Sequence, residues 1–304
     1  MCNYLENISR AIGSFSYLLV PDPLMEHGHS LEWPNTNYCA SPLEDSNEFL
    51  ERAKDVFGRL IRRTAFEKKP LSFENDEIDT VVYPLVQFTP LLGPEESTHQ
   101  HALAVVLSAL RSKLLAGARW TFSTPYFNPM TSLRSALLST TAKQGIISTG
   151  APQATSFYGT AGLTGYIPSA FTSEARRFLR GVEQSHREDQ VQLLEWQRGR
   201  GDLPGGWTYH AKGMWVTKNV EEDPCMTIVG SSNYGERSFA LDLEQDALLV
   251  TKNAGLKKRI GDEERRVLEY GRRVTREELS AGERKTGPLV FILIWFIRLV
   301  GASI

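Results

Sequence analysis

A histidine and a lysine lie two positions apart in the segment GWTYHAKGMWVTKN, residues 206–219. The segment is rich in residues that favour β-strands, and side chains alternate between the two faces of a strand. We therefore expect His210 and Lys212 to point to the same face of one strand. An imidazole can attack phosphorus or pass a proton to a leaving oxygen, and an ammonium supplies positive charge to a phosphate.

Polar side chains follow a second apolar segment, CMTIVGSSNYGERS, residues 225–238. The apolar run stops at Gly230, and the residues after it include Ser231 and Asn233. Hydroxyl and amide groups at a strand end can donate hydrogen bonds to phosphate oxygens. The two segments together predict a phosphate site in which Lys212 and Asn233 hold the phosphate and Ser231 supports it.

In this interpretation His210 is the nucleophile or the general acid in phosphodiester chemistry. The simpler alternative is a buried histidine bonded to the backbone, beside a lysine that is only a solvated charge. For an isolated His-x-Lys pair that alternative is the commoner outcome, so the functional hypothesis depends on the rest of the chain.

The composition argues against a nucleic-acid-binding protein. The 304 residues include 34 Lys and Arg against 36 Asp and Glu, a net charge of −2, whereas nucleic-acid-binding proteins carry a basic excess. Cys2, Cys39 and Cys225 are far apart and lack metal-ligand spacing, which indicates reduced thiols in a non-secretory setting. We expect no metal and no other cofactor.

Strand-like and helix-like segments alternate along most of the chain. The β-rich segments are 78–88, 119–128, 145–152, 190–197, 225–233 and 246–253, and the helical ones are 46–66, 101–118, 131–143, 173–184 and 254–281. This alternation predicts an α/β fold with a mixed β-sheet flanked by helices on both faces.

The end of the chain is apolar and follows a basic stretch. Residues 287–304 read GPLVFILIWFIRLVGASI, and the unbroken apolar run from Pro288 to Ile297 is about half of the roughly 20 residues that a spanning helix needs. Such a tail suits a helix that lies in an anionic membrane surface. The alternative is a terminal helix packed on the core.

Three blocks of the sequence, HAKGMWV, IVGSSNYGERS and DLEQDALLV, resemble the phospholipase D superfamily. The superfamily signature is His-x-Lys-x-x-x-x-Asp, then a Gly-Ser-x-Asn block, an Arg-Ser pair and a downstream Glu. The matching positions in this chain are His210, Lys212, Gly230, Ser231, Asn233, Arg237, Ser238 and Glu244. The resemblance implies a phospholipase D-like lobe in which these residues serve phosphodiester chemistry.

Further blocks narrow the resemblance to the eukaryotic mitochondrial phosphatidylglycerophosphate synthases. They are YPLVQF at 83–88, TPYFN at 124–128, FYGTAGLTGYIPSAF at 157–171 and GWTYHAKGMW at 206–215. The resemblance implies transfer of the phosphatidyl group of CDP-diacylglycerol to glycerol 3-phosphate, with release of CMP and without a metal. It also implies a peripheral place at the mitochondrial inner membrane, with the membrane surface as a partner.

The chain departs from the superfamily pattern at the expected Asp. That position, seven residues after His210, is Thr217. The resemblance implies that the Asp supports the histidine, so another acid must replace it. Asp242, Glu244 and Asp246 are the candidates, and spacing alone does not choose among them.

A second departure is that His210 is the one histidine of six with a lysine two residues on. The superfamily uses two His-x-Lys motifs, because in-line displacement places the nucleophile and the leaving group on opposite sides of phosphorus. We therefore expect residues 1–77 to be the tail of a missing first lobe plus a connector. Residues 78–281 would then be the second lobe, and 282–304 the membrane-associating tail.

A lone lobe of this kind must dimerise, borrow a separate first lobe or be inactive. One rival hypothesis is therefore a catalytically incomplete half that acts as an interaction lobe. The other is a homodimeric phosphodiesterase or nuclease with a single motif, against which the isoelectric point of about 6.3 and the apolar tail argue.

Overall fold

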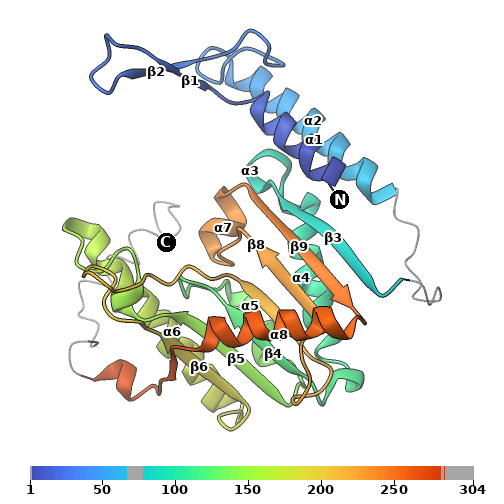
Figure 1. The fold of residues 1–304 in the computed structure, drawn as a ribbon, viewed down its shortest axis with the longest axis vertical. Helices are drawn as coiled ribbons and strands as arrows, with labels where there is room; N and C mark the ends of the chain where they lie inside the picture. The colour runs from blue at the N-terminus through green and yellow to red at the C-terminus, as the bar shows by residue number, and fades with distance from the viewer. Residues whose placement is uncertain (1, 67–77, 282–283, 285–304) are drawn as a thin grey trace. The chain divides into compact units, whose positions relative to one another are not determined.

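The computed structural model describes residues 2–66, 78–281 and 284, and the chain divides into two compact units (Figure 1). Unit 1 consists of residues 1–76 and 88–97, and unit 2 of residues 77–87 and 98–304. The elements of unit 1 are α1 (Cys2–Gly13), the hairpin strands β1 (Leu18–Pro21) and β2 (His29–Glu32), α2 (Ser46–Phe66) and α3 (Thr89–Leu92).

Unit 1 is held together by an apolar contact between its helices. Helix α2 spans the predicted residues 46–66 and carries Ala53 and Phe57, which are buried, as is Ile8 of α1. The ring of Phe57 meets that of Phe88 edge to face at 5.0 Å. Burial of such a stripe supplies most of the stability of a surface helix.

Unit 2 is built on a sheet of eight strands in the order β10-β6-β5-β4-β7-β8-β9-β3. The strands are β3 (Thr80–Gln87), β4 (Arg119–Ser123), β5 (Gln144–Gly150), β6 (Val191–Trp196), β7 (Gly213–Val216), β8 (Met226–Gly230), β9 (Glu244–Thr251) and β10 (Gly271–Arg273). Strands β4, β5 and β6 are parallel, and all other neighbours are antiparallel. The sheet is therefore mixed, as predicted.

Helices cover both faces of this sheet (Figure 1). They are α4 (Thr98–Ala109), α5 (Thr131–Leu138), α6 (Ile167–Gln184), the short α7 (Glu236–Leu241) and α8 (Ala254–Leu268). On β4, Thr121 bonds Glu264 of α8, whereas Trp120 and Phe122 lie in the core with apolar residues of α4, α5 and α6. The predicted α/β class, with helices on both faces, is confirmed.

The ends of the strands bring distant parts of the chain to one edge of the sheet, here called the site edge. Ser123 at the end of β4 pairs with Gly213 at the start of β7. Gln87 at the end of β3 pairs with Glu244 at the start of β9, and Gly230 at the end of β8 pairs with residue 246. Residues just outside these ends are therefore gathered together.

Two expectations about elements are wrong. The strand expected over 206–219 is formed only by Gly213–Val216, because the preceding segment bonds to the loop after β5 instead of to a neighbouring strand. The helix expected over 254–281 ends at Leu268, and residues 271–273 form β10 against β6.

The predicted tail at 282–304 lies outside the described residues except for Arg284. Among the residues that are described, no helix has the length and apolarity to cross a bilayer.

Candidate functional site

The segment that carries the His-x-Lys pair is fixed by hydroxyl groups at the ends of β4 and β5. The buried Tyr209 hydroxyl donates to Ser148 at 2.9 Å and lies 2.7 Å from the hydroxyl of Ser123. Ser123 also donates to the carbonyl oxygen of Ala211 at 3.0 Å, and the Tyr209 amide donates to that of Ala154 at 2.8 Å. Residues on both sides of His210 are thereby tied to the sheet.

His210 and Lys212 precede β7, so strand alternation does not bring them together. The Lys212 ammonium instead folds back to the carbonyl oxygen of His210, at 3.4 Å. His210 is exposed, and its ring meets the ring of Tyr126 edge to face at 5.6 Å. The prediction of a shared strand face is wrong, yet the two side chains belong to one short segment at the site edge.

The surroundings of the pair favour a neutral imidazole. Partial burial lowers the pKa of His210, and the positive charge of Lys212 lowers this pKa further. Burial also lowers the pKa of Lys212, while the carboxylates of Glu244 and Asp246 oppose that effect. A neutral histidine can act as a nucleophile, and the two carboxylates favour the charged form of Lys212.

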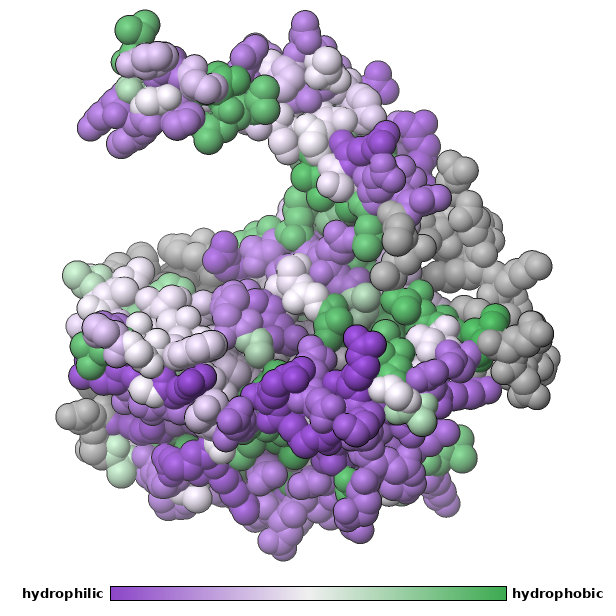
Figure 2. Space-filling view, viewed as in Figure 1, coloured by the Kyte–Doolittle hydropathy of each residue, from purple (hydrophilic) through white to green (hydrophobic). Residues whose placement is uncertain are grey.

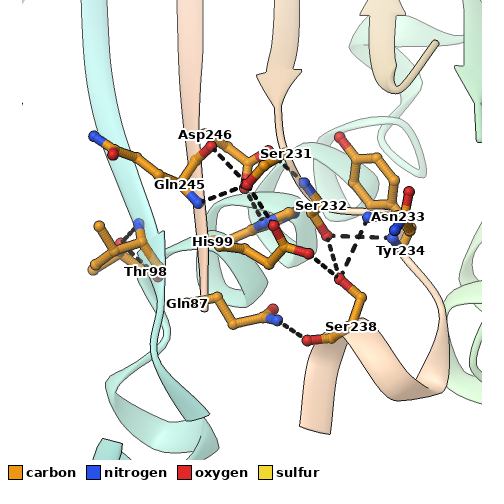
Figure 3. A network of polar contacts seen from close by, with 12 residues as sticks. Gln87, Thr98, His99, Ser231, Ser232, Asn233, Tyr234, Ser238, Gln245 and Asp246 are labelled. Atoms are coloured by element: carbon orange, nitrogen blue, oxygen red, sulfur yellow. Dashed lines mark hydrogen bonds and ion pairs between the residues drawn. The ribbon is translucent and has the colours of Figure 1, made fainter. Parts of the chain in front are cut away.

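Ser231 in the loop after β8 and Ser238 of α7, both labelled in Figure 3, donate to one buried carboxylate. Ser231 donates a short hydrogen bond to Glu244, and the buried Ser238 donates to the other oxygen of Glu244 at 2.8 Å. Ser238 also accepts from the backbone amide of Asn233 at 3.3 Å. Glu244 thus fixes two of the signature residues from the neighbouring strand.

Asn233 is held through its backbone, which leaves its side chain for other contacts. Its carbonyl oxygen accepts a hydrogen bond from Thr124 at 2.8 Å. Its buried Oδ1 atom has no hydrogen-bond partner among the described residues. A buried acceptor is costly without a donor, so a ligand that meets Oδ1 must offer it a hydroxyl or N–H group. The Nδ2 group of the same side chain is the one that can donate to phosphate oxygens.

A buried His–Asp pair behind the loop was missed by the sequence analysis (Figure 3). Nδ1 of His99, on α4, lies 2.7 Å from Oδ2 of Asp246, and both side chains are fully buried. Oδ1 of Asp246 accepts from the Ser232 amide at 3.3 Å, and the His99 ring meets Tyr234 edge to face at 5.3 Å. His99 has no lysine two residues on, so a motif search passes over it. The two-residue spacing of Asp246 from Glu244 on one strand was the available signal.

The structure places the three candidate acids differently. Glu244 contacts the loop hydroxyls and Asp246 contacts the loop backbone, whereas the carboxylate of Asp242 lies 3.6 Å from the Arg237 guanidinium. Thr217 lies beyond the far end of β7, where its buried hydroxyl accepts from the Arg119 amide at 2.9 Å. Thr217, at the position of the expected Asp, therefore links the start of β4 to the end of β7 and is remote from His210.

Close packing requires glycine at Gly230 of the signature and at Gly213, the first residue of β7. A Cβ on Gly230 would lie 2.1 Å from Oδ1 of Asp246, and one on Gly213 would lie 2.8 Å from the carbonyl oxygen of Ile228. Gly213 also has a φ of +155°, which side-chain-bearing residues rarely adopt. Gly230 therefore lets the end of β8 approach Asp246, and Gly213 lets the start of β7 approach the backbone of β8.

The fold and the site together define an α/β lobe with a polar site at one edge of a mixed sheet. A search of solved structures finds similarity to phosphatidylserine synthase from Haemophilus influenzae, with a TM-score of 0.60, 18% identity, and coverage of 97% of this chain and 59% of that one. Among the described residues, no group of three or more His, Cys, Asp or Glu is placed to hold a metal ion.

Curated relatives make the assignment more specific. The CDP-diacylglycerol–glycerol-3-phosphate 3-phosphatidyltransferase of Saccharomyces pastorianus is 32% identical over 95% of this chain and 56% of its own length. The mitochondrial enzyme of that name from Homo sapiens is 33% identical over 87% of this chain and 47% of its own. No protein-family model matches the sequence. The chain is a homologue of these phosphatidyltransferases and spans about half their length, which confirms the resemblance found in the sequence.

Proposed function

We propose that this chain provides one half of the active site of a CDP-diacylglycerol–glycerol-3-phosphate 3-phosphatidyltransferase. The observation that carries the proposal is the meeting, at one sheet edge, of the His210–Lys212 segment with the Ser231–Asn233 loop. Homology to enzymes of that name supports it. The reaction would form phosphatidylglycerophosphate, and release CMP, without a metal.

The residues divide the work between binding and bond making. Lys212 and the amide of Asn233 bind non-bridging phosphate oxygens, and Ser231, oriented by Glu244, supports them. A neutral His210 either attacks the phosphatidyl phosphorus as the bond to CMP breaks, or, once protonated, donates its proton to a leaving oxygen. In the first case the 1-hydroxyl of glycerol 3-phosphate gives its proton to a group opposite His210, and its oxygen bonds to phosphorus as the bond from phosphorus to His210 breaks.

The complete reaction needs a second group opposite His210. In-line displacement separates the attacking and leaving atoms by phosphorus, and this chain has one His-x-Lys pair. We propose that the partner histidine comes from a separate first lobe or from a second copy of this chain. That the relatives are nearly twice as long as the matched region supports the first source.

The lipid substrate and the names of the relatives support a place at a membrane in the mitochondrion. The human, chicken and mouse relatives are named as mitochondrial enzymes, and CDP-diacylglycerol carries acyl chains that remain in a bilayer. We propose a peripheral position at the inner mitochondrial membrane.

A reconstitution experiment tests this function. The full chain is mixed with a fragment of the Saccharomyces pastorianus enzyme that contains the part this chain does not match, and transfer from CDP-diacylglycerol vesicles to labelled glycerol 3-phosphate is measured. We expect transfer that falls at least about a thousandfold in His210→Ala, because the variant removes a group that bonds to the reacting atoms.

The control is His186→Ala, which alters a histidine outside the site. Absence of transfer from the mixture, and from a concentrated sample of the chain alone, would support the rival hypothesis of an interaction lobe. Hydrolysis of DNA that is lost in His210→Ala would support the nuclease hypothesis instead.

A further inference from the structure

We infer that two loops beside His210 form the surface that rests on the lipid bilayer, an inference that builds on the proposed function. The first, called the uncharged loop, is residues 156–166. The second, called the Trp207 loop, is residues 197–209. Both belong to unit 2 and flank the site edge.

The uncharged loop lies in an unusual stretch of sequence. Residues 144–173 contain no Asp, Glu, Lys, Arg or His, although 23% of the chain is Asp, Glu, Lys or Arg, a share that would place about seven in such a stretch. Ser156, residues 159–162 and Tyr166 are nevertheless exposed. Water-facing loops usually carry charge, so an exposed loop without any is suited to a low-dielectric neighbour.

The Trp207 loop adds large apolar side chains to this surface. Trp207 is 55% exposed and Leu203 is 50% exposed. The guanidinium of Arg198 lies 4.6 Å from the centre of the Trp207 ring. A tryptophan with an arginine on its face is the combination that membrane interfaces favour, because the ring enters the headgroup layer while the cation faces anionic lipid.

Contacts join the two loops to each other and to the site. Arg200 of the Trp207 loop lies over the ring of Tyr158 at 5.3 Å. The Tyr126 hydroxyl lies 3.2 Å from that of Ser156, and the same tyrosine ring meets His210. In Figure 2 the surface around the short helical turn Gly162–Tyr166 is largely white and pale green, unlike the purple surface around α8.

The position of the surface explains why a bilayer is the occupant. A phosphatidyl group reaches a histidine only if its phosphate leaves the headgroup layer while its acyl chains stay in lipid. The uncharged loop lets the site approach the headgroups without the desolvation of charged side chains, and the arginines of the Trp207 loop can remain at the headgroup level, where they face anionic lipid. A protein partner at such a contact would more often meet a charged rim.

The test measures vesicle binding and does not require catalysis. The full chain is sedimented with vesicles of phosphatidylcholine, with or without phosphatidylglycerol, and in a third arm with CDP-diacylglycerol. The variant Trp207→Ala/Leu203→Ser is compared with Leu114→Ser, which alters a leucine that is 93% exposed near the opposite end of β4. We expect the double variant to lower the partition constant about tenfold and Leu114→Ser to leave it unchanged.

A second measurement guards against a general loss of structure. Brominated lipids quench tryptophan fluorescence. The comparison is made in a Trp295→Phe background, which removes the tryptophan of the predicted tail, and we expect quenching that is largely lost when Trp207→Phe, which keeps an apolar ring, is added. The inference is overturned if the double variant binds like the wild type. It is also overturned if binding requires CDP-diacylglycerol, which would assign the loops to the substrate alone. In another outcome, the double variant keeps vesicle binding and loses binding only to the fragment of the Saccharomyces pastorianus enzyme. That result would assign the surface to a protein contact, and the inference would be overturned as well.

Discussion

At the scale of single residues, the main result concerns the charge state of His210. The imidazole is partly desolvated and lies in the same short segment as a lysine, and both effects favour its neutral form. A neutral ring is what a nucleophile toward phosphorus requires, and the same ring can take up a proton when a group leaves. The segment therefore sets reactivity as well as position.

The first prediction is that Lys212→Gln raises the pKa of His210. In the wild type this pKa lies below its usual value, so the ring stays neutral to lower pH than a free histidine. Removing the neighbouring positive charge favours protonation, and the pKa moves up, although partial burial still holds it down. NMR titration of histidine-labelled chain measures this directly, with His210→Ala to identify the signal. An unchanged pKa would mean that Lys212 does not influence the ring.

The second prediction compares how much the transfer rate depends on two of the candidate acids, Glu244 and Asp242. Glu244→Gln removes the charge that receives Ser231 and Ser238, and we expect reconstituted transfer to fall about ten- to a hundredfold. Asp242→Asn, the matched control, alters a carboxylate that faces Arg237, and we expect transfer within about twofold of the wild type. The opposite order would show that Asp242 is the acid that replaces the expected Asp.

At the scale of elements, the sequence predicted the helices and most of the strands but misjudged how the site is supported. Helix α2 and the sheet strands could be read from periodicity and from β-branched runs. The strand at 206–219 could not, because its β-favouring residues are diverted into contacts that only the folded sheet provides. Tyr209 bonds two serines from β4 and β5 that are 86 and 61 positions away. No local pattern carries that information.

The same limit applies to the candidate site. The spacing of Ser231, Asn233 and Glu244 matches a signature that sequence comparison can recognise. The structure shows that Ser231 and Glu244 are hydrogen-bonded to each other. The His99–Asp246 pair joins α4 to β9, two elements that are far apart in the sequence, and His99 belongs to no signature motif. Its role as a support for the loop follows only from three-dimensional proximity.

The third prediction concerns the hydrogen bond between Thr217 and the Arg119 amide, which links β7 to β4. Thr217→Val leaves the Arg119 amide without the hydroxyl that it bonds, at a buried position, so we expect a loss of about 1–3 kcal/mol of unfolding free energy. Because Thr217 is at the end of β7 remote from His210, transfer per folded molecule should stay unchanged. Chemical denaturation measures the first effect, and Thr217→Ser, which keeps the hydroxyl, is the control. A loss of transfer without a loss of stability would return Thr217 to the site.

At the scale of the whole molecule, the described chain brings one His210–Lys212 segment to the same sheet edge as one Ser231–Asn233 loop, and the proposed function assigns phosphate binding and bond making to these residues. Its homology to enzymes about twice the length of the shared region agrees with a division of the active site between two lobes. Under the proposed function, such a division would place the phosphorus between His210 and a group of the other lobe, as in-line displacement requires.

The order of strands in the sheet also affects how the protein is made. Strand β3 is an edge strand whose sole neighbour in the sheet is β9, and the hydroxyl contact between Thr80 and Thr251 joins residues 171 positions apart. During synthesis, β3 emerges from the ribosome early and must wait for almost the entire lobe before it can pair. Unpaired edges invite aggregation and distant pairing is slow, so we expect this lobe to depend on chaperones that shield nascent chains.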